Sequence, residues 1–178
     1  MQETINGNAK IIEELSALCT EADAIHYSTD SFGNAFHWFR LDTPRMLTRG
    51  AEILRQADTR LAMVTAYNRR QLSEPMQEVC YHFELDGVVY NMTVTLNGEW
   101  PTVPSITPMF ANADWHEREM MELYGIQVTG QPNPRRLFLD EELDAGILNE
   151  AVPLSIMMNG ACTTDLWERI LKDKENPS

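Results

Sequence analysis

Two alternating runs of apolar and polar residues, separated by an Asp-Gly pair, constrain the fold of this chain most strongly. In residues 78–85 every second residue from Val79 onward is apolar, and residues 88–96 show the same alternation from Val88 onward. Asp86-Gly87 between the runs is a strong signal for a two-residue turn that joins antiparallel strands. The sequence therefore predicts a β-hairpin over residues 78–96.

Around this hairpin the sequence predicts a mixed series of helices and strands. Apolar residues at three- and four-residue spacing indicate helices, and short runs rich in aromatic and β-branched residues indicate strands. The predicted elements are a helix over residues 10–20, strands over 24–27, 35–41 and 60–67, a helix starting at Thr43-Pro44, and an extended connection over 99–111. This order predicts an α+β fold with a mixed, largely antiparallel sheet of about five strands and helices on one face. An extended C-terminal segment and a short helix near residues 165–172 are expected to follow.

The most specific stretch runs from Asn112 to Leu139. Asp114 and Glu117 have the spacing of a capping box, with Asn112 as an alternative cap, so a helix is expected to begin here. Gly125 is the expected end of this helix, because glycine adopts the left-handed conformation at little cost. A short strand is predicted directly afterwards.

The charged residues of this helix are expected at its surface. Arg118 and Glu122 are four residues apart and, if exposed, form a pair that adds a few tenths of a kcal/mol. His116 begins a pattern that is similar to HExxH, but Met120 stands where the second histidine belongs. A zinc protease site of this type is therefore not encoded.

A Pro-Asn-Pro turn that starts at Pro132 leads into two consecutive arginines. Arg135 and Arg136 on such a stiff segment are suited to bidentate carboxylate recognition. Their carboxylates are expected either in this chain, at Glu117 and Glu119, or on a partner protein. The sequence leaves these two alternatives open.

The composition excludes several classes of function. A formal net charge of −13 disfavours contact with nucleic acids and with anionic membrane surfaces. The three cysteines are widely spaced and form no CxxC pair, and nucleotide-binding and hydrolase motifs are lacking. The N-terminus does not resemble a signal peptide, and no apolar run reaches membrane-spanning length. We expect no direct membrane insertion and no nucleic-acid partner.

The stretch from 112 to 139 resembles the 30-kDa-subunit family of respiratory complex I, the NADH:quinone oxidoreductase. The family includes related domains of membrane-bound nickel–iron hydrogenases such as formate hydrogenlyase. The resemblance implies a family-like α+β domain over residues 1–139 and a C-terminal extension over 140–178. Gln131 stands where the complex I form usually has His or Lys, which favours a hydrogenase-type relative. The residues that carry the resemblance, and that are the predicted partner interface, are Trp115, Glu117, Arg118, Glu119, Glu122, Tyr124, Gly125, Pro132, Arg135, Arg136 and Leu137.

The resemblance implies a role in assembly. Members of this family hold no cofactor and contribute no catalytic residues, so none of either is expected here. The implied function is a non-catalytic structural subunit in the peripheral arm of a respiratory NADH:quinone oxidoreductase or a related membrane-bound hydrogenase. It would dock beside the hydrogenase-large-subunit-like (49-kDa-type) subunit and a neighbouring iron–sulfur subunit, on the cytoplasmic side and peripheral to the inner membrane. The alternative is a free-standing protein-binding module of the same fold outside electron transfer.

Overall fold

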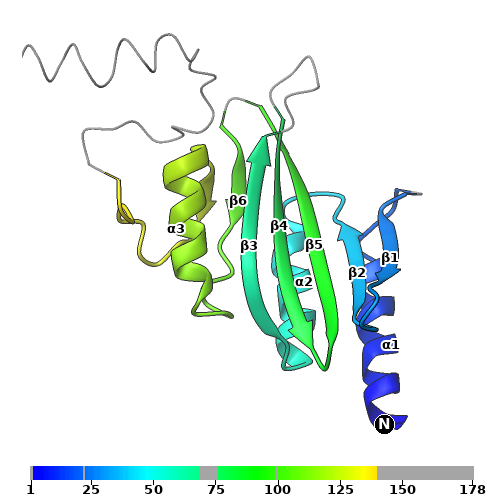
Figure 1. Ribbon diagram of the computed structural model, residues 1–178. Helices are drawn as coiled ribbons and strands as arrows, with labels where there is room; N and C mark the ends of the chain where they lie inside the picture. Colours follow the sequence, from blue (N-terminus) through cyan, green and yellow to red (C-terminus); the bar gives the residue numbers. More distant parts are fainter. Residues whose placement is uncertain (1, 22, 69–75, 99, 140–178) are drawn as a thin grey trace, which may run out of the picture.

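The computed structural model describes residues 2–21, 23–68, 76–98 and 100–139 (Figure 1). These residues form a five-stranded sheet, a two-stranded sheet and three α-helices. The predicted extension over 140–178, with its short helix, lies outside the described residues. In chain order the elements are α1 (Gln2–Ser16), β1 (Ile25–Thr29), β2 (Ala35–Arg40), α2 (Met46–Gln56), β3 (Arg60–Asn68), β4 (Met76–Leu85), β5 (Val88–Asn97), β6 (Thr102–Pro104), α3 (Ala113–Tyr124) and β7 (Gln127–Thr129).

The predicted hairpin lies at the centre of the large sheet. The strand order is β1-β2-β5-β4-β3, and every pairing is antiparallel except that of β2 with β5. Leu85 pairs with Val88, so the turn consists only of Asp86 and Gly87. Both have positive φ, +50° and +80°, as a type I′ turn requires. The predicted α+β class and mixed, largely antiparallel sheet are therefore confirmed.

The helices pack on one face of this sheet. Tyr81 and Phe83 of β4 are fully buried on that face, together with Met92 of β5. The backbone of α2 lies close to the sheet at Gly50, where an added Cβ atom would overlap the Met92 sulfur. On the α3 side, the ring of Phe110 contacts that of Phe83 with 4.9 Å between centroids. The buried residues of α1, α2 and the segment around α3 thus share one hydrophobic core.

Two elements differ from the sequence prediction. The first helix begins at Gln2 instead of residue 10 and ends at Ser16, because its polar first turns carry no apolar periodicity that would reveal them. Residues 102–104 of the predicted extended connection form β6, which pairs in parallel with β7. Prolines within the connection hide this strand, and its partner lies 25 residues further along the chain.

The two-stranded sheet of β6 and β7 positions α3 beside the five-stranded sheet. In Figure 1, α3 stands next to β3, with which it makes contact. The strand β6 precedes α3 and β7 follows it. Their pairing therefore brings together the two ends of the chain segment that contains α3. None of the described helices has both the length and the apolar composition needed to cross a membrane.

Candidate docking site on α3

The helix α3 ends as the sequence predicts but begins differently. Gly125 follows its last residue with φ of +67°, in the left-handed conformation. Asn112 occupies the N-cap position, but its side-chain amide donates to the carbonyl oxygen of Leu61 at 2.9 Å instead of capping the helix. The predicted capping box is wrong, because Asp114 lies inside the first turn and Glu117 bonds elsewhere.

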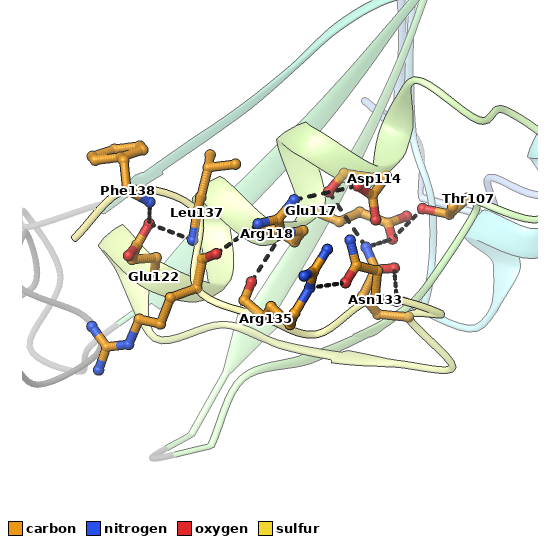
Figure 2. A network of polar contacts seen from close by, with 11 residues as sticks. Thr107, Asp114, Glu117, Arg118, Glu122, Asn133, Arg135, Leu137 and Phe138 are labelled. Carbon is orange, nitrogen blue, oxygen red and sulfur yellow. Dashed lines mark hydrogen bonds and ion pairs between the residues drawn. The ribbon is translucent and has the colours of Figure 1, made fainter. Parts of the chain in front are cut away.

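Glu117 is completely buried and joins the segments before and after the helix. Its Oε1 accepts a hydrogen bond from the Ile106 amide at 2.7 Å. Its Oε2 accepts from the hydroxyls of Ser105 and Thr107, at 2.6 and 2.8 Å, and from the Gln131 amide at 2.9 Å. Figure 2 shows dashed lines that converge on this carboxylate. One carboxylate thus fixes two chain segments with four neutral donors.

The environment of Glu117 is electrostatically unfavourable for its charge. Burial raises the pKa of Glu117, while the hydrogen bonds from residues 105–107 act in the opposite direction. Tyr81, on β4, has a pKa raised well above its usual value, first by its complete burial and then by the negative charge of Glu117. No cation among the described residues forms an ion pair with Glu117. Its charge is therefore stabilised by local dipoles alone.

Arg118 binds the backbone of the segment that follows the proline turn. Its Nε donates to the carbonyl oxygen of Arg135 at 2.8 Å, and its Nη2 donates to that of Arg136 at 2.6 Å (Figure 2). Its Nη1 lies 3.5 Å from Asp114 Oδ2, and the guanidinium lies 5.9 Å from the centre of the Trp115 ring. The predicted surface pair of Arg118 with the glutamate four residues later is therefore wrong.

Glu122 binds the next part of the same segment. It is buried, and its carboxylate accepts hydrogen bonds from three successive backbone amides. These donors are Leu137 at 3.3 Å, Phe138 at 3.1 Å and Leu139 at 2.7 Å. Consecutive amides that converge on one anion are a common way of holding a carboxylate without a cation. Figure 2 shows Glu122 pointing toward the backbone of this segment.

The two arginines of the segment do not pair with the carboxylates proposed for them within the chain. Glu117 has the four partners described above, and Glu119 lies 4.0 Å from His116 Nδ1. The Arg135 side chain is exposed and donates through Nε to Asn133 Oδ1 at 2.7 Å. The intrachain alternative is therefore wrong, and recognition of a partner's carboxylates by Arg135 and Arg136 stays a prediction.

These contacts fix the backbone of residues 135–139 along one side of α3 and leave other side chains at the surface. Trp115, the arginine at 118 and the glutamate at 122 share a helix face, since they are separated by three and four residues. Trp115 is 67% exposed and Phe138 is 61% exposed, and Arg135 is also exposed, three residues before Phe138. We call Trp115, Arg135 and Phe138 the α3 docking surface.

The other predicted interface residues lie at the margins of this arrangement. The Tyr124 carbonyl accepts a hydrogen bond from the Gln77 side chain at 2.9 Å, which ties the end of α3 to β4. Pro132 is exposed in the turn, and Leu137 is half-buried. Gln131, the departure from the family pattern, is buried against Glu117 and accepts a hydrogen bond from the Asn133 amide at 3.0 Å.

Sequence reasoning missed the hydroxyl donors that complete the site. Ser105 and Thr107 precede Glu117 by 12 and 10 residues and belong to a stretch for which the sequence predicts only an extended connection. Hydroxyl residues on either side of Ile106, between two prolines, are the one feature that could have marked them. Among the described residues, no group of three or more His, Cys, Asp or Glu side chains is placed to hold a metal ion.

The chain belongs to the family of respiratory-chain NADH dehydrogenase 30-kDa subunits, whose family model matches residues 43–160. This confirms the resemblance carried by the α3 stretch. An NADH-quinone oxidoreductase subunit of Rhodopseudomonas palustris (strain TIE-1) is 48% identical over 58 residues, which are 33% of this chain and 28% of the relative. The mitochondrial NADH-ubiquinone oxidoreductase 30.4 kDa subunit of Neurospora crassa is 39% identical over 61 residues, 34% of this chain and 22% of the relative. The matched region thus spans about a quarter of the length of these curated relatives.

Two solved structures share the fold. A trypsin-resistant fragment of Nqo5 matches 71% of this chain and 98% of the fragment, with a TM-score of 0.54 and 19% identity. A chain of the membrane-bound sulfane sulfur reductase, an archaeal respiratory membrane complex, matches with a TM-score of 0.65 and 12% identity. That alignment covers 91% of this chain and 94% of the other. The fold therefore occurs both in Nqo5 and in a chain of an archaeal respiratory membrane complex.

Proposed function

We propose that this chain is a non-catalytic structural subunit in the peripheral arm of a respiratory NADH:quinone oxidoreductase or a related membrane-bound hydrogenase. It docks through the α3 docking surface beside a hydrogenase-large-subunit-like subunit, with an iron–sulfur subunit as neighbour. In this role it lies on the cytoplasmic side, peripheral to the inner membrane, and is held there by its partners. Family membership and the shared fold with a respiratory membrane complex support this assignment.

One structural observation carries the proposal. Arg118 and Glu122, the charged residues most suggestive of chemistry, are both engaged by backbone groups of residues 135–139. Their charges therefore hold a segment in place. The result is a rigid surface with an exposed indole, an exposed phenyl ring and an exposed guanidinium. Tryptophan, tyrosine and arginine are the side chains that most often dominate binding energy at protein interfaces.

Preorganisation explains why the segment is fixed before a partner binds. A loop that must be ordered on binding costs about 0.5–1.5 kcal/mol for each immobilised side chain. Backbone hydrogen bonds to Arg118 and Glu122 meet that cost during folding. The docking surface then requires little rearrangement when a partner binds.

The test is co-purification of the full chain with its large-subunit-like partner. We expect the double variant Arg135→Glu with Phe138→Ala to reduce the recovered partner by at least roughly tenfold. Charge reversal of both Arg135 and Arg136 is expected to have a similar effect. Arg55→Glu, which reverses an exposed arginine on α2, is the matched control and is expected to leave recovery unchanged.

Two outcomes would contradict this proposal. If the unaltered chain is isolated from its native source without a redox partner, the function lies outside electron transfer and the free-standing binding module is favoured. If the partner is recovered equally with all variants, the α3 docking surface is not the interface. Neighbouring genes that encode hydrogenase or dehydrogenase subunits would support the oxidoreductase assignment.

A further inference from the structure

A cleft with a volume of about 620 Å³ lies apart from the α3 docking surface. One wall consists of residues 43–45 and Thr48, which form the turn into α2 and its first residues. The opposite wall consists of β6 together with Thr129 of β7. A space of this size matches the pockets that hold small ligands or several side chains of a peptide.

The α2 wall is rich in hydrogen-bond donors that the described residues leave unused. The hydroxyls of Thr43 and Thr48 and the guanidinium of Arg45 form no hydrogen bond or ion pair within the described part of the chain. The N-terminus of α2 has no side-chain cap either. Because the helix dipole is positive at this end, it adds to the attraction that Arg45 exerts on a negative group.

The β6 wall is neutral and largely apolar. Val103 is completely buried at the base of this wall and Pro104 is half-buried beside it. The hydroxyl of Thr102 donates to the Trp100 carbonyl at 3.0 Å, and that of Thr129 donates to the Val103 carbonyl at 3.4 Å. The hydroxyls of this wall are therefore occupied, in contrast to those of the α2 wall.

Arg45 differs from most of the described arginines of this acidic chain. With 27 acidic and 14 basic residues, most exposed arginines are expected to find a carboxylate within the protein. Within the described residues, ion pairs with carboxylates are formed by Arg40, Arg49, Arg55, Arg60 and Arg118. Arg45 has no such partner among those residues, and its position at a concave site makes it complementary to a carboxylate from outside.

We propose that this cleft is a second docking site, which takes an extended segment of a partner subunit. An Asp or Glu side chain of that segment pairs with Arg45 and the two threonine hydroxyls of the α2 wall, and an apolar side chain of the segment lies on Pro104. A protein carboxylate suits the site better than a nucleic-acid phosphate, because the net charge of −13 repels polyanions. This inference rests on the proposed role as a subunit of a larger complex.

The experiment uses the purified complex and places a primary amine in the cleft. Arg45→Lys keeps the positive charge, and a water-soluble carbodiimide then joins the new amine to any carboxylate in contact, with loss of water. Mass spectrometry of the digested complex is expected to show a cross-link from position 45 to an Asp or Glu of a partner subunit. The unsubstituted chain, whose native lysines are Lys10, Lys172 and Lys174, gives the background.

Two further variants test the contribution of the site to assembly. Arg45→Gln is expected to weaken partner recovery about fivefold, and Thr102→Trp, which fills the cleft without changing charge, at least about tenfold. Arg49→Gln is the matched control, since it removes an exposed arginine one turn further along α2 that pairs with Glu52. This control is expected to retain full recovery.

The failure of this inference can be told apart from failure of the proposed function. A cross-link only to carboxylates of this same chain, or none above background, together with full recovery of Arg45→Gln and Thr102→Trp, would overturn the second site. The α3 docking surface variants would still lose the partner in that case. If the unaltered chain has no partner at all, the proposed function fails first.

Discussion

Two buried glutamates in different regions of the molecule are stabilised in opposite ways. Glu78, on β4, is 1% exposed, and its Oε1 lies 2.9 Å from the Arg40 guanidinium. The Thr95 hydroxyl at 3.4 Å and the Tyr67 hydroxyl also donate to Glu78. Glu117, on α3, is completely buried and is held by four neutral donors without an ion pair among the described residues. One region neutralises a buried charge with a cation, and the other surrounds it with dipoles.

The difference determines what each residue controls. The Arg40 side chain is 41% exposed, so water can partly replace it beside Glu78. The donors to Glu117 come from two chain segments, 105–107 and the segment at Gln131, and the second leads directly to the docking surface. Glu78 therefore stabilises neighbouring strands, whereas Glu117 couples the stability of the domain to the position of the surface that a partner would meet.

Removal of the Glu117 carboxylate should have the largest effect. Glu117→Ala removes the acceptor of four donors, of which the Ile106 amide and the Gln131 side chain are buried, and we expect the free energy of unfolding to fall by about 3–5 kcal/mol. Urea denaturation followed by circular dichroism measures this change. The control is Glu119→Ala, which removes a half-exposed carboxylate of the same helix. A loss below about 1 kcal/mol for Glu117→Ala would show that the donors are readily solvated.

Loss of the cation beside Glu78 should have a smaller effect. Arg40→Met keeps most of the side-chain volume but leaves Glu78 without its guanidinium, and we expect a loss of about 1–2 kcal/mol, because water reaches this site. The double variant Arg40→Met with Glu78→Gln should recover part of that loss, since no buried charge then remains. If the single and double variants are equally destabilised, the charge of Glu78 is not the cause.

The smallest change in stability is expected for a cation introduced beside Glu117. The raised pKa of Glu117 means that the native state binds a proton more readily than the unfolded state. The contribution of this residue to stability is therefore fully present below the ordinary glutamate pKa and is lost as the pH rises through the raised value. Gln131→Lys supplies an ammonium group that lowers the pKa of Glu117, so this loss with rising pH should become smaller.

Stability measured as a function of pH checks this expectation. The unfolding free energy of Gln131→Lys at neutral pH should differ from that of the unaltered chain by about 1 kcal/mol or less, because the hydrogen bond of Gln131 to the Asn133 amide is lost. Gln131→Met is the matched control, since it fills a similar volume without a charge. It removes the amide donor to Glu117, so the loss of stability with rising pH should not become smaller. An unchanged slope in Gln131→Lys would indicate that Glu117 does not sense the ammonium group.

Much of the fold could be predicted from short stretches of sequence. The Asp86-Gly87 turn, the alternation on both of its strands and the glycine that ends α3 are local signals, and the structure contains each of them. The start of α3 was less predictable. The sequence contains a capping pattern at this point. In the structure, however, the Asn112 side chain donates to the Leu61 carbonyl, and Glu117 accepts from the Ile106 amide.

The roles of the charged residues on α3 depended on tertiary structure. Arg118 and Glu122 have a spacing that predicts a surface ion pair, yet each binds backbone groups 15 to 18 residues further along the chain. Nearly every residue carries the same backbone amide and carbonyl groups. Residue types therefore do not indicate which of these groups will bind Arg118 or Glu122. The strand β6 escaped prediction because its pairing partner lies on the other side of α3.

The sequence by itself determined the α+β class, the central hairpin and the family, because each depends on residue identities within a few positions of one another. The tertiary structure alone decided that Glu117, Arg118 and Glu122 bind other segments of the chain, while Trp115, Arg135 and Phe138 are exposed. The physical reason is that burial and long-range hydrogen bonds decide whether a charge serves the fold or a partner, and both arise only when distant segments pack together.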